Sequence, residues 1–170
     1  YNILMISSLK IYKGVDVLVE LAKRLPQYNF SLVLNSSQSE ITSFFSGISS
    51  NLKIYPAQPT VYKFLHEADL VLNLSNPSLW VETFGLTLLE AMAYQLPVIC
   101  PPVGGPIELV KNDENGFCID SRNMDELIEK IIYILESGNY ERLSKNAKAQ
   151  SLLFDYGNMI DEIENQIKRV

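Results

Sequence analysis

The stretch that decides the fold is residues 69–100, DLVLNLSNPSLWVETFGLTLLEAMAYQLPVIC. It contains an apolar strand pattern over 69–74, an irregular loop over 75–83, a helical pattern over 84–94 and a second apolar strand at 98–100. Two neighbouring strands that are connected by a helix run parallel to each other, because a parallel pair needs a long crossover connection. We therefore predict a strand, helix and strand unit of a parallel sheet.

The same alternation continues outward from this unit. Further strands are predicted at 2–7, 30–34, 52–55 and 117–119, and further helices at 39–45, at 61–68 and around Leu18, Leu21, Ala22 and Leu25 before Pro26. Short apolar strands, each separated by a helix, are typical of a sheet covered by helices on both faces. The predicted fold class is therefore α/β, a doubly wound, Rossmann-like parallel sheet of about six strands.

Beyond residue 120 the pattern is purely helical. Asn123 can cap a helix, with Glu126 reaching back to it, and Gly138 ends that helix. The apolar positions that define this helix and two later ones are Leu127, Ile128, Ile131, Ile134 and Leu135; Leu143 and Ala147; and Ile160, Ile163 and Ile167. Residues 1–170 are thus expected to form a single domain with additional C-terminal helices.

Composition excludes several classes of protein. With 47% hydrophobic and 20% charged residues, 170 residues suit one globular domain. The 14 basic against 20 acidic residues give a net charge of −6, which repels nucleic acid. Cys100 and Cys118 fit no metal or redox spacing and are predicted to be buried, reduced thiols, which favours a cytoplasmic setting. No apolar run approaches the roughly 18 residues of a membrane span, and the start at Tyr1 suggests a segment of a longer protein.

The strand-to-helix loop at 75–83 is where a ligand is expected, because open parallel sheets bind at the carboxyl ends of their strands. Gly85 allows close approach to the backbone, and the free N–H groups of residues 84–87 suit a diphosphate without a metal. Glu90 lies about 8 Å into the helix, where it can accept hydrogen bonds from a ribose diol. Glu82 precedes the helix, so the two carboxylates should flank a bound diphosphate. This geometry favours a nucleotide sugar.

These residues carry a resemblance to a known family. The matching segments, in family order, are KGVD at 13–16, ADLV at 68–71, ETFGLTLLEAMA at 82–93, LPVI at 96–99, VGG at 103–105 and NGF at 115–117. Together they resemble the C-terminal domain of retaining glycosyltransferases of family 4, whose two-domain fold is called GT-B. The likeness covers nearly the whole chain.

The resemblance assigns a role to each matching position. It implies that the donor's diphosphate is held by Lys13 and by the backbone N–H groups of Phe84, Gly85, Leu86 and Thr87. It implies that Glu90 binds the ribose. Glu82 would contact the donor sugar near the reacting carbon and is the implied catalytic residue. It further implies that Gly104 and Gly105 form a close-packed turn beside the nucleotide and that Pro56 and Ala57 edge the base through their backbone. The family needs no metal or other cofactor, so Lys13 and the helix N-terminus would stabilise the leaving diphosphate.

One position departs from the family pattern. Ser8 stands where the family has an arginine, five residues before the lysine, so a fixed positive charge is missing from the donor site. Either a basic residue of the absent partner domain compensates, or donor affinity and turnover are reduced, or the chain is a degenerate relative.

The prediction is therefore the donor-binding half of a glycosyltransferase that takes a UDP-, GDP- or ADP-linked sugar, acts in cell-surface polysaccharide or glycan biosynthesis and lacks here its N-terminal acceptor domain. The isolated chain should be inactive, and the full-length protein is expected in the cytoplasm, with peripheral attachment to the inner face of the membrane through the missing half. The alternatives are a nucleotide-sugar epimerase of the same architecture and a non-catalytic nucleotide-sugar-binding module. His66 is not expected to be catalytic, and Trp80 is either a lid or a loop anchor.

Overall fold

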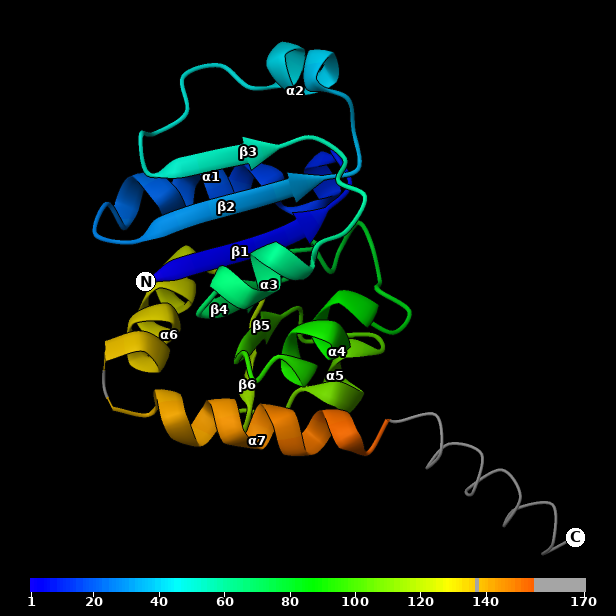
Figure 1. Ribbon diagram of the computed structural model, residues 1–170, viewed down its shortest axis with the longest axis vertical. Coiled ribbons are helices and arrows are strands. Elements are labelled where there is room, and N and C mark those ends of the chain that lie inside the picture. The colour runs from blue at the N-terminus through cyan, green and yellow to red at the C-terminus, as the bar shows by residue number, and fades with distance from the viewer. Residues whose placement is uncertain (137, 155–170) are drawn as a thin grey trace, which may run out of the picture.

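Six parallel strands form the central sheet of the computed structural model, which describes residues 1–136 and 138–154 (Figure 1). The strands are β1 Asn2–Ser7, β2 Asn29–Leu34, β3 Leu52–Tyr55, β4 Leu70–Leu72, β5 Val98–Cys100 and β6 Gly116–Cys118. Their order in the sheet is β3-β2-β1-β4-β5-β6. The predicted doubly wound parallel sheet is confirmed, and the strand order reverses direction between β1 and β4.

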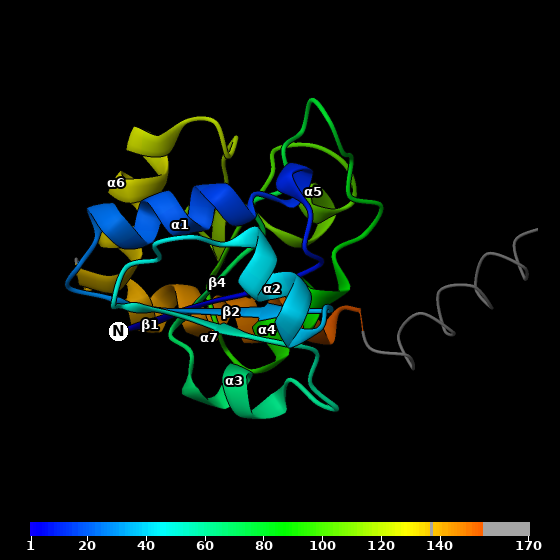
Figure 2. The ribbon, with the colours of Figure 1, turned by 90° about the horizontal axis from the view of Figure 1, so that it is seen from above.

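Helices lie on both faces of this sheet (Figure 2). They are α1 Val15–Arg24, α2 Gln38–Phe44, α3 Tyr62–Glu67, α4 Leu86–Ala93, α5 Pro106–Leu109, α6 Met124–Glu136 and α7 Tyr140–Leu152, with one 3-10 turn, η1 Ile11–Lys13. Helices α1 and α6 share one apolar core with the sheet, and α3 and α4 share the other. Within the described residues, no helix is long and apolar enough to cross a bilayer.

The strands build these two cores by the alternation of their side chains. In β1, Ile3 and Met5 belong to the core under α1, whereas Leu4 between them belongs to the core under α3. Ile3, Leu4 and Met5 are all at most 1% exposed. A strand that is apolar on both sides is what a sheet covered on both faces requires.

Helix α7 is held by polar contacts to α4 and to the turn before β6. Lys148 Nζ donates a hydrogen bond to the carbonyl of Ala93, at the C-terminal end of α4, over 2.9 Å. Arg142 pairs with Asp113 before β6 at 2.8 Å, and this guanidinium lowers the pKa of the Asp113 carboxyl. These contacts fix α7 to α4 and to the turn that leads into β6.

The element boundaries differ from the prediction in a few places. Helix α5 was not predicted, because four residues are too few to show a helical period. The helix predicted over 84–94 begins at Leu86, so Phe84 and Gly85 belong to the loop before it. The predicted cap on α6 is confirmed, since Asn123 Oδ1 accepts the Glu126 N–H. The helix predicted around Ile160 lies outside the described residues.

Gly14 connects η1 to α1 in a conformation that few other residues can adopt. Its φ is +78°, and a Cβ there would lie 2.2 Å from the carbonyl oxygen of Leu74. The backbone after β1 therefore packs directly on the backbone after β4. This contact places Lys13 beside the loop at 75–83.

We predict that Gly14→Ala destabilises the chain far more than Gly47→Ala does. Both glycines have positive φ, but a Cβ at Gly47 would meet no atom within 4 Å. The left-handed conformation should cost Gly47→Ala about 1 kcal/mol, and the added clash should bring Gly14→Ala to roughly 3 kcal/mol. Urea unfolding followed by circular dichroism measures both, and equal losses would contradict the close packing at Leu74.

Candidate functional site

Two adjoining cavities lie at the carboxyl end of the sheet, the first at the ends of β1 and β4, where the strand order reverses, and the second at the ends of β1 and β2. The first cavity has a volume of about 330 Å³ and is lined by Met5, Ile6, Ser7, Ser8, Lys13, Asn73, Ser75, Glu82, Thr83, Phe84, Gly85, Leu86 and Thr87. The reversal point is the usual ligand crevice of a doubly wound sheet. The cavity brings together seven of the predicted site residues, from three separate parts of the chain.

Lys13 and Glu82 form an ion pair at this cavity. Lys13 Nζ lies 2.8 Å from Glu82 Oε2, and the two side chains are 15% and 21% exposed. The same ammonium lies 4.7 Å from the ring centre of Trp80, and that ring stacks on Tyr12 at 5.3 Å. Trp80 thus packs against η1 as a loop anchor, although 41% of it remains exposed.

Backbone N–H groups supply the next wall of the cavity. Among the described residues, the N–H groups of Phe84, Gly85, Leu86 and Thr87 have no hydrogen-bond partner, and the first intrahelical bond of α4 is donated by Leu88 to Gly85. All four of these residues line the first cavity. Unpaired N–H groups at a helix start, with a lysine ammonium nearby, attract an anion.

The glycines at 104 and 105 lie behind this loop and do not line either cavity. A Cβ on Gly105 would lie 2.1 Å from the carbonyl oxygen of Thr83, and one on Gly104 would lie 2.3 Å from that of Glu82. The Gly105 N–H also donates a hydrogen bond to the Glu82 carbonyl over 2.9 Å. Their close-packed turn therefore holds the backbone of Glu82 in place.

The second cavity, of about 340 Å³, shares Ile6, Ser7, Ser8 and Thr87 with the first and extends to Asn35, Ala57 and Gln58. Ala57 lines it, but the Ala57 N–H already donates to the carbonyl of Ser36. Pro56 lines neither cavity, and its carbonyl accepts a hydrogen bond from Gln58 Nε2 over 2.9 Å. Of the backbone groups of Pro56 and Ala57, the Ala57 carbonyl is therefore the one left to bind a ligand.

Glu90 lies one turn along α4 beyond Thr87 and lines neither cavity. It is exposed, and no ion pair among the described residues involves it. Ser8 lines both cavities, and Lys13 is the sole lysine or arginine among the described residues that line them. The positive charge of the site thus comes from one side chain that already has a carboxylate partner.

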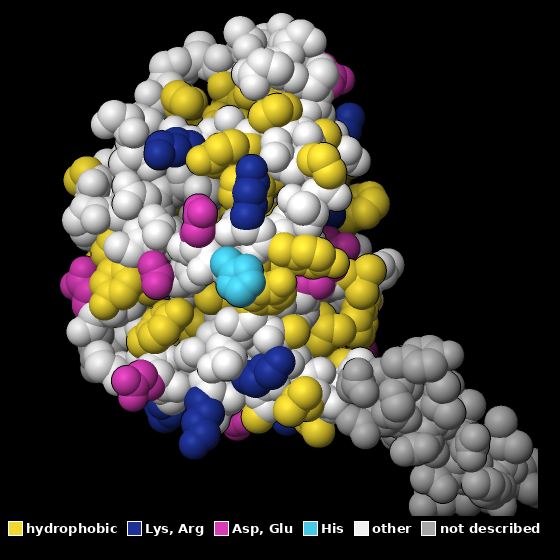
Figure 3. All heavy atoms as spheres, viewed as in Figure 1, with side chains coloured by type: hydrophobic (Ala, Val, Ile, Leu, Met, Phe, Trp, Pro, Cys, Tyr) yellow, Lys and Arg dark blue, Asp and Glu magenta, His cyan; other side chains and the backbone are white. Residues whose placement is uncertain are grey.

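The remaining candidates lie away from this site. His66 is exposed on α3, edge-on to the ring of Tyr94 at 5.0 Å, and Figure 3 shows this histidine at the surface with hydrophobic side chains beside it. Cys100 and Cys118 are free thiols whose sulfur atoms lie 3.6 Å apart on neighbouring strands. The Cys118 contact and burial raise the pKa of Cys100, which keeps this thiol protonated. Cys100 is buried as predicted, whereas Cys118 is only partly buried.

Asn73 and Ser75 are among the residues that line the first cavity and that sequence reasoning missed. Asn73 Oδ1 accepts the N–H of Ser75 over 3.1 Å. Ser75 is 1% exposed, and its hydroxyl oxygen is buried without a hydrogen-bond partner. Their position directly after a buried strand was the available signal, but serine and asparagine are also common in loops.

We predict that Ser75→Ala stabilises the ligand-free chain. A buried hydroxyl without a partner retains an unfavourable desolvation cost, so its removal should raise the free energy of unfolding by about 1 kcal/mol. Ser78→Ala is the matched control, because Ser78 is exposed in the same loop and should change little. Urea unfolding compares the two variants, and a loss of stability in Ser75→Ala would mean that the hydroxyl is satisfied in solution.

The family model and the similar sequences agree on one protein family. Residues 1–150 match the family model for glycosyl transferases group 1. A sucrose synthase of Melioribacter roseus is 46% identical over 71 residues, which cover 39% of this chain and 9% of that protein. An uncharacterized glycosyltransferase of Haemophilus influenzae is 27% identical over 166 residues, which cover 92% of this chain and 45% of that protein. The chain thus spans less than half the length of these relatives.

Solved structures share the fold. Anabaena Alr3699/HepE in complex with UDP-glucose superposes with a TM-score of 0.82 at 25% identity, covering 100% of this chain and 49% of that one. The C-terminal domain of a glycosyl transferase group 1 family protein, LpcC of Francisella tularensis, superposes with a TM-score of 0.71 at 19% identity, covering 88% of this chain and 83% of that domain. With a family model that matches 150 of its 170 residues, the chain belongs to the glycosyl transferases group 1 family.

Proposed function

We propose that this chain is the donor-binding domain of a retaining glycosyltransferase and that its two cavities hold a nucleotide sugar. The observation that carries the proposal is the convergence of the Lys13 ammonium and four unpaired backbone N–H groups on one cavity at the reversal of the strand order. The diphosphate would lie in this first cavity and the nucleoside in the second. UDP is the first nucleotide to test, because the similar Anabaena structure contains UDP-glucose.

The Lys13–Glu82 ion pair suggests how donor binding changes the site. A diphosphate that reaches Lys13 competes with the carboxylate of Glu82 for the same ammonium. Glu82 is then free to accept hydrogen bonds from hydroxyls of the donor sugar. Both groups therefore exchange a contact with each other for a contact with the substrate.

Transfer breaks the bond between the anomeric carbon of the donor sugar and the diphosphate oxygen and forms a bond from that carbon to the acceptor oxygen, and the acceptor hydroxyl gives up its proton as the diphosphate leaves. Negative charge develops on the leaving diphosphate. Lys13 and the N–H groups at the start of α4 lie where they would stabilise this charge. No three His, Cys, Asp or Glu side chains in the described part of the chain cluster as metal ligands, and independence from metal stays a prediction.

This chain spans less than half the length of its relatives. The acceptor would bind in the part of the whole protein that lies outside this chain. We propose that this other half is an N-terminal acceptor domain that adds a cation to the cleft, because Ser8 adds none and Lys13 is paired. We further propose that the complete enzyme acts in cell-surface polysaccharide or glycan biosynthesis on the cytoplasmic side of the membrane. The chain alone is then inactive but able to bind the donor.

Lys13→Gln should weaken nucleotide binding while Lys10→Gln does not. Lys10 is exposed three residues earlier and lines neither cavity, so it matches the change in charge. Loss of a charged hydrogen bond corresponds to an affinity about 10- to 100-fold lower. Isothermal titration calorimetry with UDP, GDP and ADP measures the effect. An absence of heat with all three nucleotides at millimolar concentration, or equal affinities for the two variants, would contradict the proposal.

Glu90→Ala should remove the preference for a ribonucleotide. If Glu90 accepts hydrogen bonds from the ribose diol, the chain will bind UDP about tenfold more tightly than 2′-deoxy-UDP, and Glu90→Ala will bind both with similar affinity. Glu108→Ala, which removes an exposed acid on α5, is the control and should keep the preference. A Glu90→Ala variant that still distinguishes the two nucleotides would remove Glu90 from the site.

A further inference from the structure

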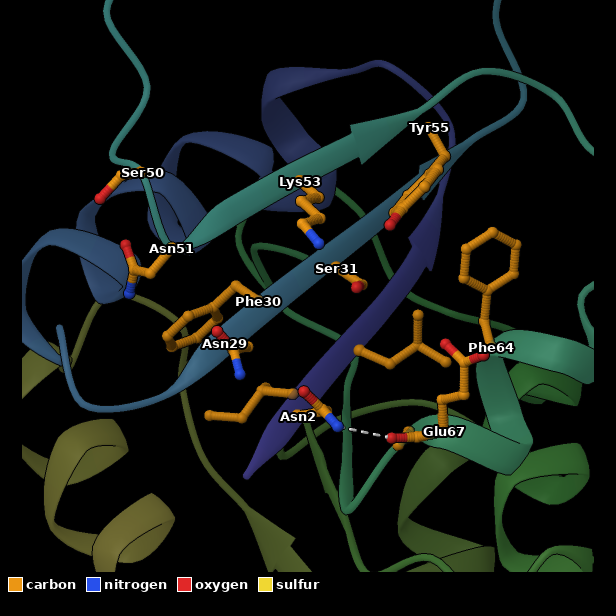
Figure 4. Close-up of a pocket in the computed structure, with 13 residues that line it drawn as sticks. Asn2, Asn29, Phe30, Ser31, Ser50, Asn51, Lys53, Tyr55, Phe64 and Glu67 are labelled. Atoms are coloured by element: carbon orange, nitrogen blue, oxygen red, sulfur yellow. Dashed lines mark hydrogen bonds between the residues drawn. The ribbon is translucent and has the colours of Figure 1, made fainter.

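A second, polar hollow lies on the sheet at the opposite end from the donor cavities. It has a volume of about 180 Å³ and is lined by residues from β1, β2, β3 and α3 (Figure 4). The strand register places Leu4, Ser31 and Lys53 side by side across the three strands, with Asn2 beside Asn29 nearer the amino ends. Helix α3 packs against β1 and leaves Asn29 and Ser31 of β2 and Lys53 and Tyr55 of β3 lining the hollow.

The wall formed by the sheet carries unused hydrogen-bonding groups. Within the described residues, the side chains of Asn29, Ser31 and Lys53 and the hydroxyl of Tyr55 have no hydrogen bond or ion pair. Figure 4 shows the Lys53 ammonium and the Tyr55 hydroxyl both directed toward the space around Ser31. Strand β3 is an edge strand of the sheet, and Asn29 and Lys53 are exposed, so these groups are open to a ligand that enters from solvent.

The opposite wall adds the buried ring of Phe64 and one carboxylate, so the aromatic surface open to a ligand is that of the partly exposed Tyr55. Phe64 packs edge-on against the ring of Tyr55 at 4.8 Å between ring centres. Glu67 lies next to it on α3, its backbone carbonyl accepting a hydrogen bond from Asn2 Nδ2 over 2.9 Å. The Glu67 carboxylate has no partner among the described residues, so it can accept hydrogen bonds from a ligand.

These groups match the chemistry of a sugar that carries an acidic group. Amide, hydroxyl and carboxylate side chains complement the hydroxyls of a pyranose, and the apolar face of the ring can pack on an aromatic side chain. Lys53 has no acidic partner in the part of the chain that the structure describes and is left to bind an anion. We propose that this hollow binds one acidic sugar unit, a pyranose with a carboxylate or a phosphate, independently of the donor site.

The proposal is tested by nuclear magnetic resonance on the ¹⁵N-labelled 170-residue chain. Glucuronic acid and glucose 6-phosphate are the two acidic probes, which separate a carboxylate from a phosphate, and glucose and inorganic phosphate are the neutral and sugar-free controls. At least one acidic sugar should shift the amide signals of Ser31, Lys53 and Tyr55 with a millimolar dissociation constant. Glucose and inorganic phosphate should each bind at least about tenfold more weakly, because glucose lacks the acidic group and inorganic phosphate lacks the sugar.

Variants then assign the binding to the hollow. Lys53→Gln should lose about tenfold in affinity, and Tyr55→Phe, which keeps the ring against Phe64, should lose less. Lys111→Gln, the same change at an exposed lysine outside the hollow, should bind as the parent chain does. Lys13→Gln should keep the acidic sugar while it loses UDP, so that failure of one site can be distinguished from failure of the other.

Three results would overturn the proposal. They are no amide shifts with either acidic sugar, equal binding of glucose or inorganic phosphate, and full binding by Lys53→Gln. If the parent chain binds an acidic sugar but none of UDP, GDP and ADP, the result counts against the donor site alone.

Discussion

The site depends on backbone packing between loops at the carboxyl end of the sheet. Gly14 packs against the carbonyl of Leu74, and Gly105 packs against Thr83. Neither approach leaves room for a side chain, so the loop after β1, the loop after β4 and the turn after β5 have a fixed separation. This constraint brings Lys13 and Glu82, 69 positions apart in sequence, to within 2.8 Å of each other.

The electrostatics of the site follow from that contact. The unpaired N–H groups at the start of α4 form a positive pole, and the Lys13 ammonium beside them is balanced by the Glu82 carboxylate. The ligand-free cavity is thus close to neutral, which suits a region of partly buried side chains. An anion that displaces Glu82 gains both the ammonium and the amide groups, while the displaced carboxylate can remain solvated at the edge of the cavity.

Much of the fold could be predicted from the sequence, because buried parallel strands leave short apolar runs such as Val98–Cys100. The predicted loop and the residues Ser8, Lys13, Glu82 and 84–87 do meet at one cavity. What could not be predicted depends on packing in three dimensions. The sequence does not indicate that Ser75 is buried without a partner, that Gly104 and Gly105 lie behind the loop, or that Ala57 uses its N–H on Ser36. Contacts to Glu90 from a nucleotide also stay a prediction.

The hydrogen bond from Lys148 to Ala93 gives α7 a part in the site that it never touches. Helix α4 receives a cation at its C-terminal end and offers open amides at its N-terminal end, so both of its poles are engaged by opposite charge when an anion is bound. A chain that ended before α7 would leave the C-terminal pole of α4 uncompensated and the outer surface of α4 uncovered. The rigidity of the N–H groups at the start of α4 thus depends partly on residues more than fifty positions downstream of them. Domain boundaries drawn around the sheet alone would remove that contact.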